Sequence, residues 1–164
     1  GVPLKVRIDF LKRSTMVELK SFSNPYRKPV NDVILGAIWS YRYDIQAAAC
    51  FDAYEHLYAH VRDGRVYGKC PLPAGWESQL ASPDDMCWTW IFQCKEADIT
   101  RGLTIPRDYP GLIRARRDIA RAKATYRACW ERFGTERPWV SDDGIRNLTE
   151  ADVPKWFRED VEAL

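Results

Sequence analysis

Two acidic residues and a lysine near the start of the sequence have the types and the spacing that suit phosphodiester hydrolysis. Asp9 is followed by Glu18, and Lys20 stands two positions after Glu18. Two carboxylates supply the hard oxygen ligands that Mg²⁺ prefers, and a bound Mg²⁺ polarises a phosphoryl oxygen. A nearby ammonium group orients the attacking water or offsets negative charge on the phosphorus. The spacing alone equally fits three solvated residues on the open face of a hairpin.

Two short strands must position these three residues. Residues 6–10 alternate between apolar and charged side chains, which is the period of a half-buried strand. Residues 15–20 alternate too, so Glu18 and Lys20 share one face. If the strands pair, Asp9 comes close to both at one end of the hairpin. Charges gathered beside apolar strands cost free energy unless they bind a cation or do chemistry.

The remaining pattern predicts a small mixed sheet with helices. Helices are expected at residues 32–41, 43–61 and 111–133, with a short final helix after Thr149. Strands are expected at residues 65–69, 86–95 and 102–105. The order of these elements predicts an α/β or α+β fold, in which a small mixed central sheet is flanked by helices.

Composition favours a soluble, reduced protein. The chain has 164 residues, of which 46% are hydrophobic and 29% are charged, and this suits one globular domain. No apolar run approaches the roughly 20 residues needed to span a bilayer, and no signal peptide is visible. We therefore expect a cytoplasmic protein without a membrane partner. The five cysteines are widely spaced, which favours reduced thiols over a metal cluster.

Charge is distributed unevenly along the chain. The net charge is only +2, yet arginine and lysine dominate residues 101–132 and acidic residues dominate residues 141–164. A basic helix suits a phosphate-backbone partner, with Arg114, Arg117 and Arg121 as the expected contacts, although a solvated arginine-rich helix fits as well. His56 and His60 lie four residues apart, and we expect surface histidines there rather than metal ligands.

Several motifs occur in an order that is familiar. They are Arg-Ile-Asp9, Val-Glu18-Leu-Lys20-Ser, Tyr41-Arg-Tyr43-Asp-Ile-Gln46-Ala-Ala and, near the end, Phe-Gly-x-x-x-Pro-Trp after an Arg/Ala-rich helix. This series resembles the PD-(D/E)XK nuclease superfamily, and more narrowly the RecE-type and RecB-like exonucleases. The resemblance implies a restriction-endonuclease-like core. It also implies DNA cleavage with Mg²⁺ or Mn²⁺, in many relatives as exonucleases on linear duplex ends.

The resemblance also assigns roles to single residues. It implies that Asp9 and Glu18 are metal ligands and that the Leu19 carbonyl is a further one. Lys20 would serve the attacking water and the transition state. Gln46 would hold the lysine or the substrate. Tyr43 would lie beside Gln46 and contact the substrate.

Two features depart from the family pattern. Cys50 stands where the family usually has a tyrosine, four residues after the helix glutamine. The family also carries an acid or histidine on a helix before the first strand. This sequence starts five residues before Val6 and shows no such helix. Either the chain is a fragment, or another chain supplies the group, or only one metal binds well.

We expect residues 1–164 to form one nuclease-like domain. Its catalytic hairpin and helix would lie at residues 4–62, and its basic helix and C-terminal tail at residues 101–164. Three hypotheses follow for its function. The first is a Mg²⁺- or Mn²⁺-dependent deoxyribonuclease, an exonuclease on linear double-stranded DNA in phage-type recombination or repair. It would work alone, as a homo-oligomer or with a recombination partner protein. The second is a catalytically silent nuclease-fold module for DNA binding or assembly. The third is an unrelated protein in which the triple is coincidental.

Overall fold

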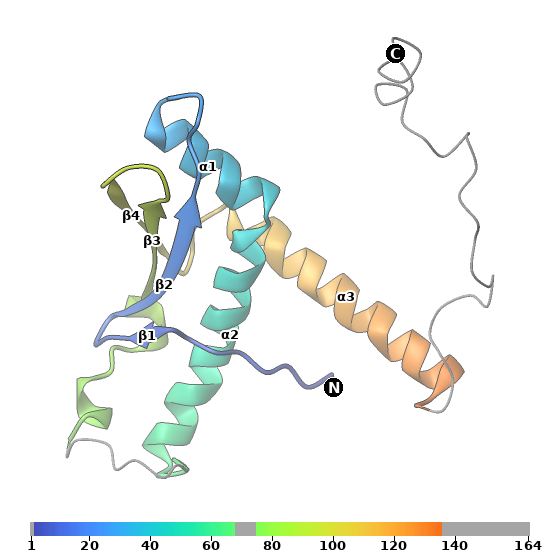
Figure 1. Ribbon diagram of the computed structural model, residues 1–164. Helices are drawn as coiled ribbons and strands as arrows, with labels where there is room; N and C mark the ends of the chain where they lie inside the picture. Colours follow the sequence, from blue (N-terminus) through green and yellow to red (C-terminus); the bar gives the residue numbers. More distant parts are fainter. Residues whose placement is uncertain (1, 68–74, 136–164) are drawn as a thin grey trace, which may run out of the picture. The chain divides into compact units, whose positions relative to one another are not determined.

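The structure is a computed structural model that describes residues 2–67 and 75–135 (Figure 1). The chain divides into two compact units, Gly1–Arg127 and Ala128–Leu164. The sheet, the first two helices and the first part of the third helix belong to the first unit, and so do all the candidate site residues. The expected final helix after Thr149 lies outside the described residues.

A four-stranded mixed sheet forms the framework of the first unit. Its strands are β1 (Phe10–Leu11), β2 (Thr15–Phe22), β3 (Cys87–Cys94) and β4 (Thr100–Pro106), in that spatial order. β2 pairs in parallel with β3, and the outer pairs are antiparallel. This confirms the mixed α/β class expected from the order of elements. The strand expected at residues 65–69 is absent at 65–67, and 68–69 lie outside the described residues.

Within residues 2–67 and 75–135, three α-helices accompany the sheet. They are α1 (Val30–Ser40), α2 (Tyr43–Arg62) and α3 (Leu112–Phe133), all close to the ranges that periodicity predicts. Two 3₁₀ turns, η1 (Glu77–Gln79) and η2 (Pro83–Asp85), precede β3. α2 ends where Gly64 adopts a φ of 68°, a left-handed conformation that glycine takes without a Cβ penalty. None of the described helices has the length and apolar character needed to cross a membrane.

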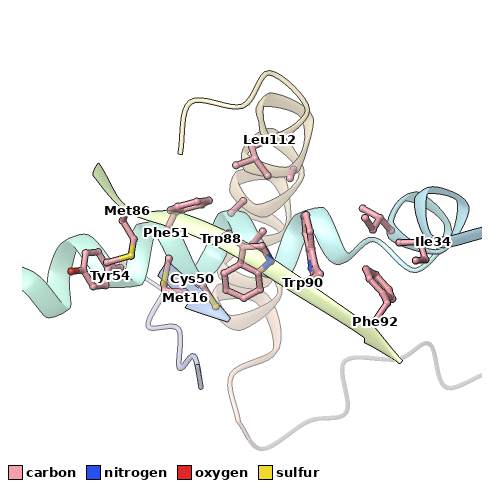
Figure 2. Close-up of a cluster of buried hydrophobic side chains, with 14 of the residues drawn as sticks. Met16, Ile34, Cys50, Phe51, Tyr54, Met86, Trp88, Trp90, Phe92 and Leu112 are labelled. Atoms are coloured by element: carbon pink, nitrogen blue, oxygen red, sulfur yellow. The ribbon is translucent and has the colours of Figure 1, made fainter. Parts of the chain in front are cut away.

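One buried cluster joins the sheet to the helices (Figure 2). Its side chains come from β2, β3, α1, α2 and the start of α3: Met16, Ile34, Cys50, Phe51, Tyr54, Trp88, Trp90, Phe92 and Leu112 among others. Because side chains alternate along a strand, the residues between those of the cluster face the other side of the sheet, where Leu19 is 50% exposed. Glu18 and Lys20 therefore share the helix-facing side of β2 with the core.

The hairpin at the start of the chain is shorter than residues 6–10 predict. β1 begins at Phe10, and Asp9 lies in a bend before it. The Asp9 carboxylate, rather than a backbone carbonyl, lies next to the Leu19 N–H, and a side chain that bonds the backbone competes with the ladder. The strand prediction for residues 6–9 is therefore wrong, and the bend aims an acidic side chain at β2.

Candidate active site

β2 places Glu18 and Lys20 side by side against the helices. Lys20 Nζ lies 2.7 Å from Glu18 Oε1, and the two side chains are 16% and 8% exposed. The second carboxylate oxygen, Glu18 Oε2, is buried and has no hydrogen-bond partner within the described part of the chain. A buried carboxylate oxygen without a donor is costly, so a cation or a proton donor that reached it would be bound favourably.

Asp9 approaches the same point from the bend that precedes β1. Its Oδ2 lies 3.4 Å from the Leu19 backbone nitrogen, at the long end of hydrogen-bond range. In the register that pairs Phe10 with Val17, the next position opposite Asp9 is Glu18. The structure thus brings together the two carboxylates and the lysine, which the sequence spacing alone left undecided.

The Leu19 backbone carbonyl lies on the β1 side of β2, as the position of the Leu19 N–H implies. The N–H and C=O of one strand residue point toward the same neighbouring strand. Since the Leu19 N–H meets the Asp9 carboxylate, its C=O lies on the side where β1 has already ended. An acceptor oxygen at this position is available to a ligand rather than used by a β-ladder.

α2 lies over these residues with Tyr43, Gln46 and Cys50 on one face. The Lys20 ammonium lies 4.6 Å from the centre of the Tyr43 ring, a cation–π contact that holds the lysine in place. Gln46 is half-buried and makes no side-chain hydrogen bond within the described residues, so the expected contact with Lys20 is not formed. It lies one turn from Tyr43, within the spacing that places side chains on the same helix face.

Cys50 lies in the field of all three charged groups. Burial raises the pKa of its thiol to about 11. The negative charges of Glu18 and Asp9 raise it too, whereas the positive charge of Lys20 lowers it. A tyrosine at this position would bring a hydroxyl to the carboxylates, whereas the thiol makes this wall of the site largely apolar. The sequence identifies Cys50 only as a departure from the family pattern.

The predicted DNA-contacting arginines lie on the exposed surface of α3. Arg114 and Arg121 stand 3.8 and 3.5 Å from carboxylate oxygens of Asp118, and Arg117 is exposed on the same part of the helix. Asp118 also accepts a 2.8 Å hydrogen bond from Arg42, which holds the pKa of Asp118 below its usual value. Arg114 and Arg121 are therefore held near Asp118, and within the described residues no ion pair or hydrogen bond joins the three arginines to Glu18 or Lys20.

Arg42, just before α2, has an unusual backbone conformation that sequence patterns do not reveal. Its φ of 56° and ψ of 42° are left-handed, which costs a residue other than glycine about 1–2 kcal/mol. Its guanidinium offsets this cost with two hydrogen bonds to Asp44 and one to Asp118. The turn at Arg42 brings Tyr41 and Tyr43 into ring contact, with their centres 5.7 Å apart.

The oxygen atoms around Glu18 fit a hard divalent cation. Magnesium keeps several waters and needs only one or two protein carboxylates, so Asp9, Glu18 and the Leu19 carbonyl suffice as protein ligands. The partnerless Glu18 Oε2 is the atom that such an ion would satisfy. Within the described residues, no group of three or more His, Cys, Asp and Glu side chains is placed to hold a metal ion.

Comparison with protein-family models, with curated proteins and with solved structures finds no match. The roles that the resemblance implies for these residues therefore stay predictions.

Proposed function

We propose that the protein is a metal-dependent DNA nuclease with a PD-(D/E)XK core that acts on linear double-stranded DNA. The observation that carries the proposal is the buried Glu18–Lys20 pair with one free carboxylate oxygen beside Asp9. A solvated hairpin face would leave Glu18 in water, but its side chain is 8% exposed. Burial of a charged pair that is incompletely bonded is characteristic of sites kept for chemistry.

The side chains would divide the work as follows. Asp9, Glu18 and the Leu19 carbonyl would hold Mg²⁺ or Mn²⁺, which when bound supplies polarisation of the phosphoryl oxygen. Lys20 presents a compact positive charge that stabilises negative charge as it develops on the phosphorus. Tyr43 holds the Lys20 ammonium by its ring face and so limits its movement. Gln46, without a partner here, has its amide free for substrate.

The arginines of α3 would contribute binding rather than chemistry. Arg114, Arg117 and Arg121 occur at intervals of three and four residues, so they form one exposed row on the helix. Arginine binds phosphate oxygens in pairs through its planar guanidinium. A row of three suits successive phosphates of a DNA backbone.

The decisive experiment measures release of label from end-labelled linear duplex DNA with Mg²⁺ or Mn²⁺, with a closed circular duplex in parallel. We expect release from the linear DNA only. Lys20→Ala should reduce the rate about 100-fold or more, as expected for loss of a transition-state contact. Lys12→Ala removes an exposed lysine from the hairpin turn and should cut normally. If Lys20→Ala folds and cuts as fast as the parent, the proposed role of this site is wrong.

A second candidate uses the same surface without cleavage. The exposed row of Arg114, Arg117 and Arg121 favours a DNA-binding or assembly module with the nuclease fold. In that case the parent protein binds duplex DNA at low salt, with affinity that falls steeply as salt rises, and releases no label with either metal.

A further inference from the structure

A continuous series of contacts leads from the buried carboxylate to the surface of the protein. Lys20 bonds Glu18 and also lies over the ring of Tyr43. Tyr43 in turn contacts Tyr41, with ring centres 5.7 Å apart and planes inclined by 33°. Tyr41 is 70% exposed, so one aromatic ring of the series faces solvent. The outermost ring is therefore joined to the candidate catalytic lysine by a single intervening side chain.

The left-handed turn at Arg42 maintains this arrangement. Because Arg42 has a φ of 56°, the side chains on either side of it meet instead of pointing apart. The hydrogen bonds from its guanidinium to Asp44 and Asp118 hold the strained backbone. Strained residues that the surrounding structure over-determines gather at functional sites, so the strain is a second sign that the tyrosine pair has a role.

Cationic residues lie near the tyrosine pair. Lys20 contacts the ring of Tyr43, which is in contact with Tyr41. Arg42, between the two tyrosines, bonds Asp118, which also pairs with Arg114 and Arg121 on α3. An exposed aromatic ring near cationic side chains matches a nucleotide, whose base stacks and whose phosphates are anionic. A purely apolar protein partner would gain nothing from these charges.

We propose that the exposed ring of Tyr41 is a subsite that stacks the terminal base of a DNA strand whose backbone leads toward Lys20. The choice of DNA as the ligand rests on the proposed nuclease function. Stacking on an aromatic ring is tolerant of sequence, because every base has a π-face. The subsite therefore selects a strand end, where a base is free to leave the duplex, and it selects no particular sequence.

The test is a double-mutant cycle between Tyr41 and the terminal base. Binding is measured in EDTA, so that no cleavage occurs, on linear duplexes that carry either a normal or an abasic terminal nucleotide. For the parent, removing the base should weaken binding about 10-fold. Tyr41→Ala should bind normal DNA about 10-fold more weakly than the parent does. It should bind abasic DNA as tightly as the parent does, because the ring and the base stabilise binding only together. Tyr41→Trp should restore the preference for the normal end.

A matched control comes from the far end of α2. Tyr67 is 89% exposed and follows that 20-residue helix, which is about 30 Å long. Tyr67→Ala should behave as the parent does on both DNAs. If Tyr41→Ala binds the normal end as tightly as the parent, or weakens both DNAs equally, the subsite does not exist. A parent that shows the expected coupling but never cleaves DNA overturns the nuclease proposal and leaves the subsite standing.

Discussion

Glu18 and Asp44 are the two acidic side chains that the described part of the chain buries, and they differ in how their oxygens are used. Both oxygens of Asp44 accept hydrogen bonds from Arg42, at 3.0 and 3.1 Å. Glu18 has one oxygen on Lys20 and the other without a partner. Asp44 therefore has a complete structural role, whereas Glu18 retains an unused bonding position inside the protein.

This difference predicts different results for two equivalent substitutions. Glu18→Gln removes the charge that faces Lys20, but its amide oxygen can still accept the Lys20 hydrogen bond and its amide group adds a donor, so we expect the free energy of unfolding to fall by about 1 kcal/mol or less. Asp44→Asn weakens bonds that hold the strained Arg42, so we expect a loss of about 1–2 kcal/mol. Urea unfolding of the two variants measures both values. A larger loss for Glu18→Gln than for Asp44→Asn would mean that Glu18 is structural.

Metal binding provides a separate readout on the same two variants. Trp90 pairs with Glu18 in the sheet register, so bound Mn²⁺ should quench tryptophan fluorescence there. Saturable quenching is expected for the parent and for Asp44→Asn, but not for Glu18→Gln. Quenching that is unchanged in Glu18→Gln would place the ion elsewhere.

At the scale of elements, most residues of α3 are exposed or half-buried. Only Leu112 and Ala115 are buried among its residues, both in the first turn or just after it. The hydrophobic positions farther along face solvent or are half-buried, in company with arginine and lysine. The helix therefore contributes to the core mainly through its first turn.

The salt dependence of DNA binding tests whether the arginine row contacts phosphates. Each phosphate contact contributes about −0.9 to the slope of log K against log salt concentration. Replacing Arg114, Arg117 and Arg121 by glutamine should reduce the magnitude of that slope by about 2–3. Replacing exposed Arg7 and Arg13 serves as a control and should leave the slope unchanged. An unchanged slope in the triple variant would exclude these arginines as phosphate contacts.

The elements were largely predictable from sequence, because hydrophobic periodicity reports which face is buried. The alternation around Glu18 and Lys20 correctly indicates that the two side chains share one face of a strand. The apolar pattern of residues 43–61 correctly predicts α2. The length of β1 was not predictable, since the Asp9 side chain replaces a backbone acceptor. The left-handed Arg42 carries no local signal either, because glycine or asparagine normally marks such a turn. Its conformation depends on Asp118, which is distant in sequence.

At the scale of the whole molecule, α2 ties the sheet to the segment before β3 through a buried tyrosine. The Tyr54 hydroxyl donates a 2.8 Å hydrogen bond to the Ala81 carbonyl. Burial raises the pKa of Tyr54 to about 12 and that of Cys50, on the same helix, to about 11. The fold favours the neutral form of both groups. The free energy of unfolding therefore depends on pH in the alkaline range.

The sign of this dependence is fixed by the direction of the shifts. A raised pKa stabilises the fold fully below the unfolded-state pKa, and this contribution is lost as pH rises through the folded-state value. The parent should therefore lose stability from about pH 9 upward, first through Cys50 and then through Tyr54. Tyr54→Phe should lower the free energy of unfolding by about 1 kcal/mol at pH 7. Between about pH 10 and 12 the free energy of unfolding of this variant should fall less than that of the parent, which urea unfolding at several pH values would measure. A parallel decline in the variant and the parent would contradict this assignment.

β2 and β3 pair in parallel although α1 and α2 lie between them in the chain (Figure 1). A chain under synthesis acquires Asp9, Glu18, Lys20 and Gln46 by the time α2 is complete, but it does not yet contain the strand that supports them. Closing so long a loop is slow compared with forming a hairpin or a helix. We therefore expect the candidate site to form only when β3 leaves the ribosome and docks, so that an incomplete chain would carry the residues of the site without its geometry.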